Sequence, residues 1–261
     1  MKNYILIIRF LLLLNFFSLS AQNYNKKLVA IFAHPDDEQS VAPILVKFVE
    51  EGVDVTLVIA TDGRLGVNDY SDYKAGDILA EVRRKEMVCA AEILGVKLIH
   101  LNYHDQLKAA EGFNGHVPYA QDLIIELKQI ISKIKPDAII TWGPDGVTTH
   151  MDHRLIGASV TQIYVSNKWD HEMDLFYFGT PNSFLINERQ KSLRGQEQKF
   201  LTVQIPFTSN QYDVAYESLL CHKSQYPAHI IAKMKDDRKK MGNIIYFREF
   251  SVPQRIRNSL F

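Results

Sequence analysis

The sequence predicts an α/β fold with an open, doubly wound, mostly parallel sheet and helices on both faces. Short runs rich in β-branched residues alternate with helical patterns along most of the chain. Parallel neighbouring strands require a crossover connection, usually a helix, so this alternation indicates successive βα units. The chain has 261 residues, of which 46% are hydrophobic and 23% are charged, which is typical of a globular protein of one domain.

Four strand and helix units account for the alternation. We expect strands at Lys27 to Ala33, Asp54 to Thr61, Lys97 to Tyr103 and Asp137 to Trp142. We expect helices at about Gln39 to Glu51, Ile78 to Leu94, Ala120 to Ile134 and from about His153. Gly52, Gly95 and Pro136 act as stop signals for the first three helices. Such a Rossmann-like sheet binds its ligands beyond the carboxyl ends of the strands, which places the functional loops there.

The remainder of the chain is less regular. Asp174 to Phe178 and Leu201 to Ile205 have the pattern of further strands, and Asp213 to Leu220 has that of a helix. No internal repeat and no low-complexity linker separates this part from the rest. We therefore expect an irregular C-terminal extension of the same domain.

The first 21 residues have the pattern of a signal peptide. Lys2 precedes an apolar run from Ile5 to Phe17 that contains Arg9, and small residues follow up to Ala21. The run is shorter than the ~20 apolar residues that a membrane-spanning helix needs. We therefore expect cleavage near Ala21, a secreted or periplasmic domain over residues 22–261, and no stable membrane insertion after cleavage.

The charge balance and the cysteine content argue against nucleic-acid binding and against cysteine-based catalysis. Lys+Arg and Asp+Glu both total 30, so no net field attracts nucleic acid, and we expect no nucleic-acid partner. Cys89 and Cys221 are too few for a disulfide framework, although an oxidising compartment would permit one bridge. Cys89 stands in a helical pattern, where a small buried thiol is the expected role. We predict no catalytic cysteine.

Ionisable side chains crowd the ends of the first and fourth predicted strands. The first is followed by His34-Pro35-Asp36-Asp37-Glu38 and lacks the glycines of a dinucleotide-binding turn. Imidazole and carboxylate ligands suit a catalytic zinc ion, which takes three protein ligands and one water. The cluster from His150 to His153 follows the fourth strand and opens onto the same crevice. Taken singly, an aspartate at a helix start is commonly an N-cap and a lone histidine is commonly structural.

Together these motifs resemble the LmbE-like (PIG-L) family of zinc deacetylases. The resemblance rests on Ala33 to Glu38, the H-x-D-H of His150 to His153, Thr61-Asp62-Gly63, Arg83-x-x-Glu86 and His222-Lys223-Ser224-Gln225. It implies that Zn²⁺ is bound by His34, Asp37 and His153. It also implies that Asp36 is the general base and that His150 helps to stabilise the oxyanion.

Four further residues near the motifs are candidates for orienting a ligand or binding substrate, and each also has a purely structural interpretation or departs from the family pattern. Asp152 fits an orienting role, in which it accepts a hydrogen bond from a histidine ring. Arg83 matches a substrate-binding position of the family, although a helical arginine is more often solvated or ion-paired. Asp105 follows the third strand and is suited to sugar hydroxyls or to a turn. Arg64 departs from the glutamate that many relatives carry after T-D-G, so substrate identity does not transfer simply.

The resemblance implies hydrolysis of an N-acyl amide on an amino sugar or glycoconjugate. A zinc amidase that acts on a non-sugar acyl-amine is the first alternative. A non-catalytic carbohydrate-binding protein of the same fold ranks lower, because Asp36 and His150 are present beside a full ligand set. A two-metal phosphoesterase ranks lowest, because only Glu38 and Asp62 remain as spare carboxylates.

Overall fold

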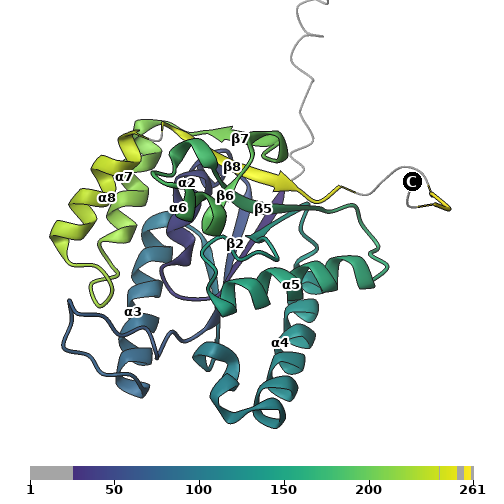
Figure 1. The fold of residues 1–261 in the computed structure, drawn as a ribbon, viewed down its shortest axis with the longest axis horizontal. Coiled ribbons are helices and arrows are strands. Elements are labelled where there is room, and N and C mark those ends of the chain that lie inside the picture. The colour runs from purple at the N-terminus through teal and green to yellow at the C-terminus, as the bar shows by residue number, and fades with distance from the viewer. Residues whose placement is uncertain (1–25, 241, 252–255, 260–261) are drawn as a thin grey trace, which may run out of the picture.

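The computed structural model describes residues 26–240, 242–251 and 256–259, which form an open mixed sheet with helices on both sides (Figure 1). The strands are β1 (Lys27–Phe32), β2 (Asp54–Thr61), β3 (Lys97–Tyr103), β4 (Ala138–Trp142), β5 (Asp174–Pro181), β6 (Gly195–Gln196), β7 (Val203–Pro206) and β8 (Ile244–Glu249). The α-helices are α2 (Ala42–Glu50), α3 (Asp77–Leu94), α4 (Phe113–Ile134), α5 (Met151–Ser166), α6 (Glu188–Arg194), α7 (Ser209–Leu219) and α8 (Ala228–Lys240). Short 3-10 helices are η1 (Asp37–Ser40), η2 (Asp105–Glu111), η3 (Asn182–Phe184) and η4 (Gln198–Phe200).

The order of the strands places a ligand site between β1 and β4. The sheet runs β3-β2-β1-β4-β5-β8-β7, and β6 pairs with β5 outside this path. The first five strands in this order are parallel, whereas β8 is antiparallel to both β5 and β7. The chain turns outward from β1 to β2 and β3 and returns to the other side of β1 as β4. The carboxyl ends of β1 and β4 therefore flank the topological switch point of the sheet.

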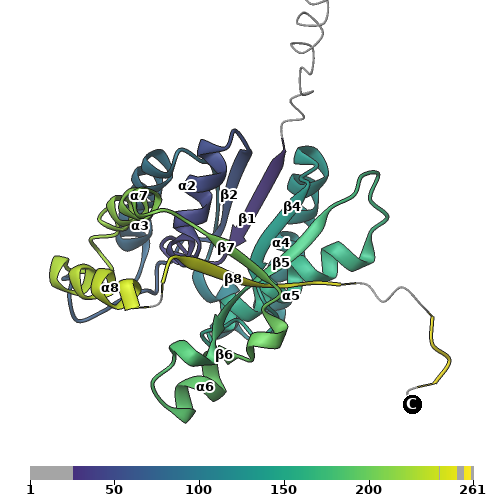
Figure 2. The same ribbon diagram turned by 90° about the horizontal axis from the view of Figure 1, so that it is seen from above.

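Alternating side chains of β1 serve two separate cores. Leu28, Ala30 and Phe32 pack into a core with helices α2, α3 and α7. Val29 and Ile31 pack into a second core with α4 and α5. Figure 2 shows these two groups of helices on opposite sides of the sheet. Successive residues of a strand point to opposite faces of the sheet. Because both faces of β1 are covered by helices, every position of the strand after Lys27 is apolar.

The predicted doubly wound α/β fold is confirmed, and its differences from expectation have physical reasons. The helix expected from Gln39 begins as η1 at Asp37 and continues as α2, with Pro43 in the first turn. Helix α4 begins at Phe113 rather than Ala120, because its first turns pack against η2. The C-terminal extension is more regular than expected, since β7 and β8 join the sheet as antiparallel strands.

Cys89 and Cys221 form a disulfide bond, so the prediction of a free, buried thiol at Cys89 was wrong. The bond joins α3 to the segment that follows α7, across 132 positions of sequence. Only the packing of α7 beside α3 brings these two positions together.

The predicted signal peptide, residues 1–21, lies outside the described residues. Within the described ranges, no helix has both the length and the apolar character needed to cross a membrane.

Candidate metal centre and active site

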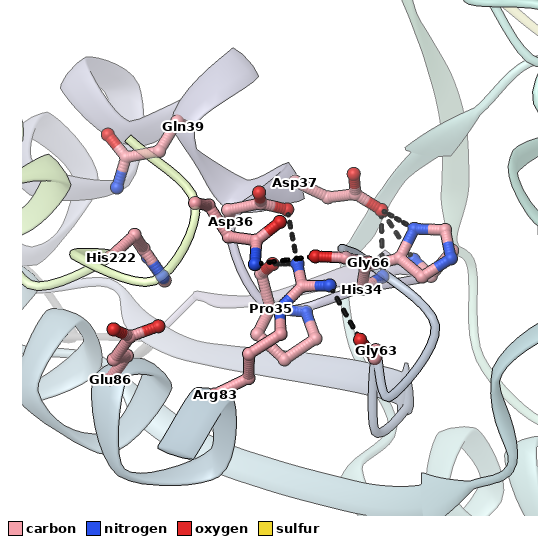
Figure 3. A network of polar contacts seen from close by, with 12 residues as sticks. His34, Pro35, Asp36, Asp37, Gln39, Gly63, Gly66, Arg83, Glu86 and His222 are labelled. Atoms are coloured by element: carbon pink, nitrogen blue, oxygen red, sulfur yellow. Dashed lines mark hydrogen bonds and ion pairs between the residues drawn. The ribbon is translucent and has the colours of Figure 1, made fainter. Parts of the chain in front are cut away.

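The Asp37 carboxylate lies at the centre of the site, between two histidine rings. Its Oδ2 accepts hydrogen bonds from the backbone N–H groups of Ala33, at 3.0 Å, and His34, at 2.8 Å. His153 Nε2 lies 3.1 Å from Asp37 Oδ1, and His34 Nδ1 lies 3.4 Å from Oδ2. Figure 3 shows the carboxylate of Asp37 on the side of His34 and directed away from Arg83. The loop after β1 therefore fixes this carboxylate through its own backbone.

Both histidines are oriented by hydrogen bonds to their outer ring nitrogens. His34 Nε2 lies 3.0 Å from Asp152 Oδ2 and 3.2 Å from Asp105 Oδ1. His153 Nδ1 lies 2.6 Å from the Thr148 hydroxyl. These contacts leave His34 Nδ1 and His153 Nε2 directed at Asp37, in the arrangement by which neighbouring groups prepare histidine as a metal ligand.

The donor atoms fit a metal ion of the zinc type. Ring nitrogens of His34, His150 and His153 all lie within 4.8 Å of one another, and Asp37 contacts two of these rings. A second group of donors, from His34, Asp105 and Asp152, meets the same distance limit. Asp105 and Asp152 already accept backbone N–H groups of Leu65 and Gln106 as well as His34 Nε2. We therefore favour a site on the side of the first group, with His34, His153 and the Asp37 carboxylate between them as ligands and His150 at its edge. Imidazole and carboxylate ligands are those that zinc takes in catalytic sites.

The electrostatics of the cluster favour a positive charge at its centre. Burial favours a neutral carboxyl at Asp37, but the charges of His153 and His34 hold its pKa well below the usual value. Burial opposes a charged ring at His34, yet the Asp37 carboxylate and the contacts with Asp105 and Asp152 raise its pKa well above the usual value. The Asp37 carboxylate therefore stays ionised, and its negative charge stabilises a positive charge placed between it and the histidine rings. A bound cation would supply that positive charge.

Asp36 lies beside this cluster in an unusual backbone conformation. Its φ is 99° and its ψ is −17°, in the left-handed region that L-residues adopt at a cost of ~1–2 kcal/mol. Its Oδ1 lies 3.2 Å from Arg83 Nη2, and the Tyr226 hydroxyl is within hydrogen-bonding reach of the same carboxylate. Burial raises the pKa of Asp36, against the opposing charge of Arg83 and with the support of the Asp37 charge. A raised carboxyl pKa suits a general base that works near neutral pH.

His150 occupies the exposed side of the cluster. It is the N-cap of α5, and its Nδ1 accepts a hydrogen bond of 3.2 Å from the backbone N–H of Asp152. Its ring centroid lies 4.7 Å from that of His34 and 5.0 Å from that of His153. Partial burial, together with the charges of these two rings, lowers the pKa of His150. The lowered pKa favours the neutral ring, and because Nδ1 accepts the Asp152 N–H, Nε2 is the nitrogen that carries the proton in that form.

The two predicted substrate-binding residues are occupied by contacts within the protein. Arg83 is buried, and its guanidinium donates to the backbone oxygens of Pro35 and Gly63, as Figure 3 shows. Gly63 has a left-handed φ of 65°, and the Arg83 guanidinium fills the space that a Cβ would need there. Asp105 is buried behind His34. Their contact with substrate stays a prediction.

Several residues of the site carried no assigned role in the sequence. The indole of Trp142 stacks on His153 with ring centroids 4.4 Å apart, and Thr148 orients the same ring. Glu38 and His222 form a buried pair behind Asp36. The only signal for His222 was the HKSQ segment, whose spacing from the strand ends reveals no contact.

Comparison with known proteins agrees with this geometry. Residues 29–164 match the family model described as PIG-L, GlcNAc-PI de-N-acetylase. The chain is 32% identical over 141 residues to a 1D-myo-inositol 2-acetamido-2-deoxy-alpha-D-glucopyranoside deacetylase of Corynebacterium glutamicum, covering 49% of each chain. It is 33% identical over 137 residues to a diacetylchitobiose deacetylase of Thermococcus kodakarensis, covering 51% of this chain and 46% of the relative. The chain thus spans about half the length of the curated relatives it matches.

A solved structure shares the fold over most of the chain. The N,N'-diacetylchitobiose deacetylase of Pyrococcus horikoshii superposes with a TM-score of 0.65 at 23% sequence identity. The match covers 89% of this chain and 87% of that one. The likeness therefore extends through the C-terminal strands, beyond the residues matched by the family model.

Proposed function

Because the chain belongs to the PIG-L family of GlcNAc-PI de-N-acetylases, we propose that it is a zinc-dependent N-deacetylase that acts on a substrate containing N-acetylglucosamine. The observation that carries this proposal is the position of Asp36, a partly buried carboxylate with a raised pKa, next to the His34, Asp37 and His153 cluster at the β1 and β4 strand ends. The names of the relatives support the substrate class, since both concern deacetylation of N-acetylated amino sugars. The partner would be a small molecule or a glycan.

Zn²⁺ bound by His34, Asp37 and His153 would supply a Lewis acid that polarises the amide carbonyl and lowers the pKa of water. Asp36 accepts a proton from the attacking water while the water oxygen forms a bond to the carbonyl carbon. His150 donates a hydrogen bond from Nε2 to the developing oxyanion, because its Nδ1 already accepts from the backbone of Asp152. Asp36 passes its proton to the amide nitrogen as the C–N bond breaks, which releases acetate and the free amine.

We further propose that the protein is secreted or periplasmic. The support is the leader pattern of residues 1–21 together with the disulfide bond between Cys89 and Cys221, since such bonds persist mainly in oxidising compartments. Cell fractionation, followed by mass spectrometry of the mature N-terminus and of the linked cysteine peptides, tests this location. Full-length protein with reduced cysteines in the cytosolic fraction would contradict it.

Amine release from a panel of N-acetylglucosamine derivatives tests the activity. The purified mature protein is assayed with added zinc, after chelation, and after zinc is restored, with Asp36→Asn as the inactive control. We expect release that depends on both zinc and Asp36. Absence of release from every sugar, with metal bound at a one-to-one ratio, would contradict the sugar substrate and favour a non-sugar amide.

A further inference from the structure

A buried acid and base pair lies directly behind the loop that carries Asp36. Glu38 and His222 are both 0% exposed, and His222 Nε2 lies 2.7 Å from Glu38 Oε1. The two residues are 184 positions apart in sequence. Taking such a pair out of water is costly, and an apolar pair of similar volume often stabilises a fold equally well or better. Fold stability alone is therefore a weak reason for this pair to be present.

The pair is joined to Asp36 through the backbone. Glu38 Oε2 accepts a hydrogen bond of 2.9 Å from the backbone N–H of Asp36, and Gln39 Nε2 donates to Oε1 at 2.7 Å. His222 thus fixes one carboxylate oxygen of Glu38 while the other binds Asp36. Since the left-handed conformation of Asp36 costs free energy, the hydrogen bond to its N–H is one of the contacts that keep it there.

His222 is itself held by a short segment, residues 221–226, that is anchored to the other walls of the site. The segment lies outside residues 29–164, which match the family model. Figure 3 shows His222 above Glu86, which projects from α3 together with Arg83. Its anchors are the Cys89–Cys221 disulfide, the bonds from Ser224 N and Oγ to Glu86 at 2.7 Å each, the bond from Gln225 Nε2 to the Gly66 oxygen at 2.9 Å, and the contact of Tyr226 with Asp36.

We propose that Glu38 and His222 are positioning residues that hold Asp36 in the conformation required for deacetylation, and that residues 221–226 complete the active site from outside the matched family region. This inference rests on the proposed function. Neither side chain reaches a reacting atom, because both are fully buried. They act through the backbone of Asp36, which leaves its carboxylate between Arg83, Tyr226 and the metal-binding cluster.

Two replacements of His222 separate its hydrogen bond from its volume. In His222→Gln the side-chain amide still donates to Glu38, whereas His222→Met has similar bulk and no donor. For His222→Met we expect kcat to fall by ~10–100-fold, the scale typical of lost orienting contacts around metal sites. KM and metal content should remain within about twofold of wild type, and His222→Gln should recover most of kcat. A His222→Met enzyme with wild-type kcat would overturn the proposal.

Glu38→Gln provides a test that does not depend on the folding of His222→Met. Its amide cannot accept from Asp36, Gln39 and His222 together, so we expect a similar fall in kcat, and little additional fall when His222→Met is combined with it. Crystal structures should show Asp36 leaving the left-handed region in Glu38→Gln and in any folded His222→Met. Additive losses of kcat, or an unchanged Asp36 backbone, would contradict the proposal. If the wild type releases no amine, the proposed function is refuted. The crystal structures still test whether Glu38 and His222 hold the Asp36 backbone in place.

Discussion

Removal of the Cys89–Cys221 disulfide should lower the free energy of unfolding by several kcal/mol. The bond links positions 132 residues apart, so it removes a large amount of conformational entropy from the unfolded chain. The chain-entropy relation gives about 17 cal/mol/K for a loop of this length, which corresponds to about 5 kcal/mol at 25 °C. Whole domains are stable by only ~5–15 kcal/mol, so this loss is a large share of the total.

Urea unfolding of wild type and Cys89→Ala/Cys221→Ala, followed by tryptophan fluorescence, measures this difference. Wild type in reductant should unfold at about the same urea concentration as the double variant, whose own transition should not respond to reductant. A difference below about 1 kcal/mol would refute the entropic reasoning. Alkylation of two free thiols in the unreduced, denatured wild type would refute the bond itself.

Three further predictions concern the site. Asp36→Asn should retain its metal while kcat falls by ~10²–10⁴-fold, as measured by elemental analysis and amine release; loss of metal would contradict the base assignment. His153→Ala should lose the metal itself, whereas replacement of His229, an exposed histidine outside the site, by alanine should leave the metal bound. Burial opposes charge on His222, but Glu38 raises its pKa above the unfolded value near 6.5. Its stabilising contribution is therefore complete below pH ~6.5 and declines as pH rises through the raised pKa. The unfolding free energy of wild type should exceed that of His222→Gln by more at pH 6 than at pH 9, and a pH-independent difference would contradict this.

The strands and the first motif were predictable because their signals are local. After Lys27, the run KLVAIF is apolar at every position and so on both faces, which indicates a strand buried on two sides. In the structure β1 lies inside the sheet and pairs with both β2 and β4. His34, Asp36 and Asp37 follow that strand directly, so their position at the sheet edge follows from the strand assignment. The start of α4 was not predictable, because packing against η2 determines it.

The sequence by itself determined the α/β class, the strand ends that form the site and the residue types suited to a metal ion. These follow from periodicity and from side-chain chemistry, both of which act over a few neighbouring residues. Only the tertiary structure decided the Cys89–Cys221 bond, the inward direction of Arg83 and the contact of His222 with Glu38. Each of these depends on which helix faces pack together, and a pairing across 132 or 184 positions leaves no periodic trace in the sequence.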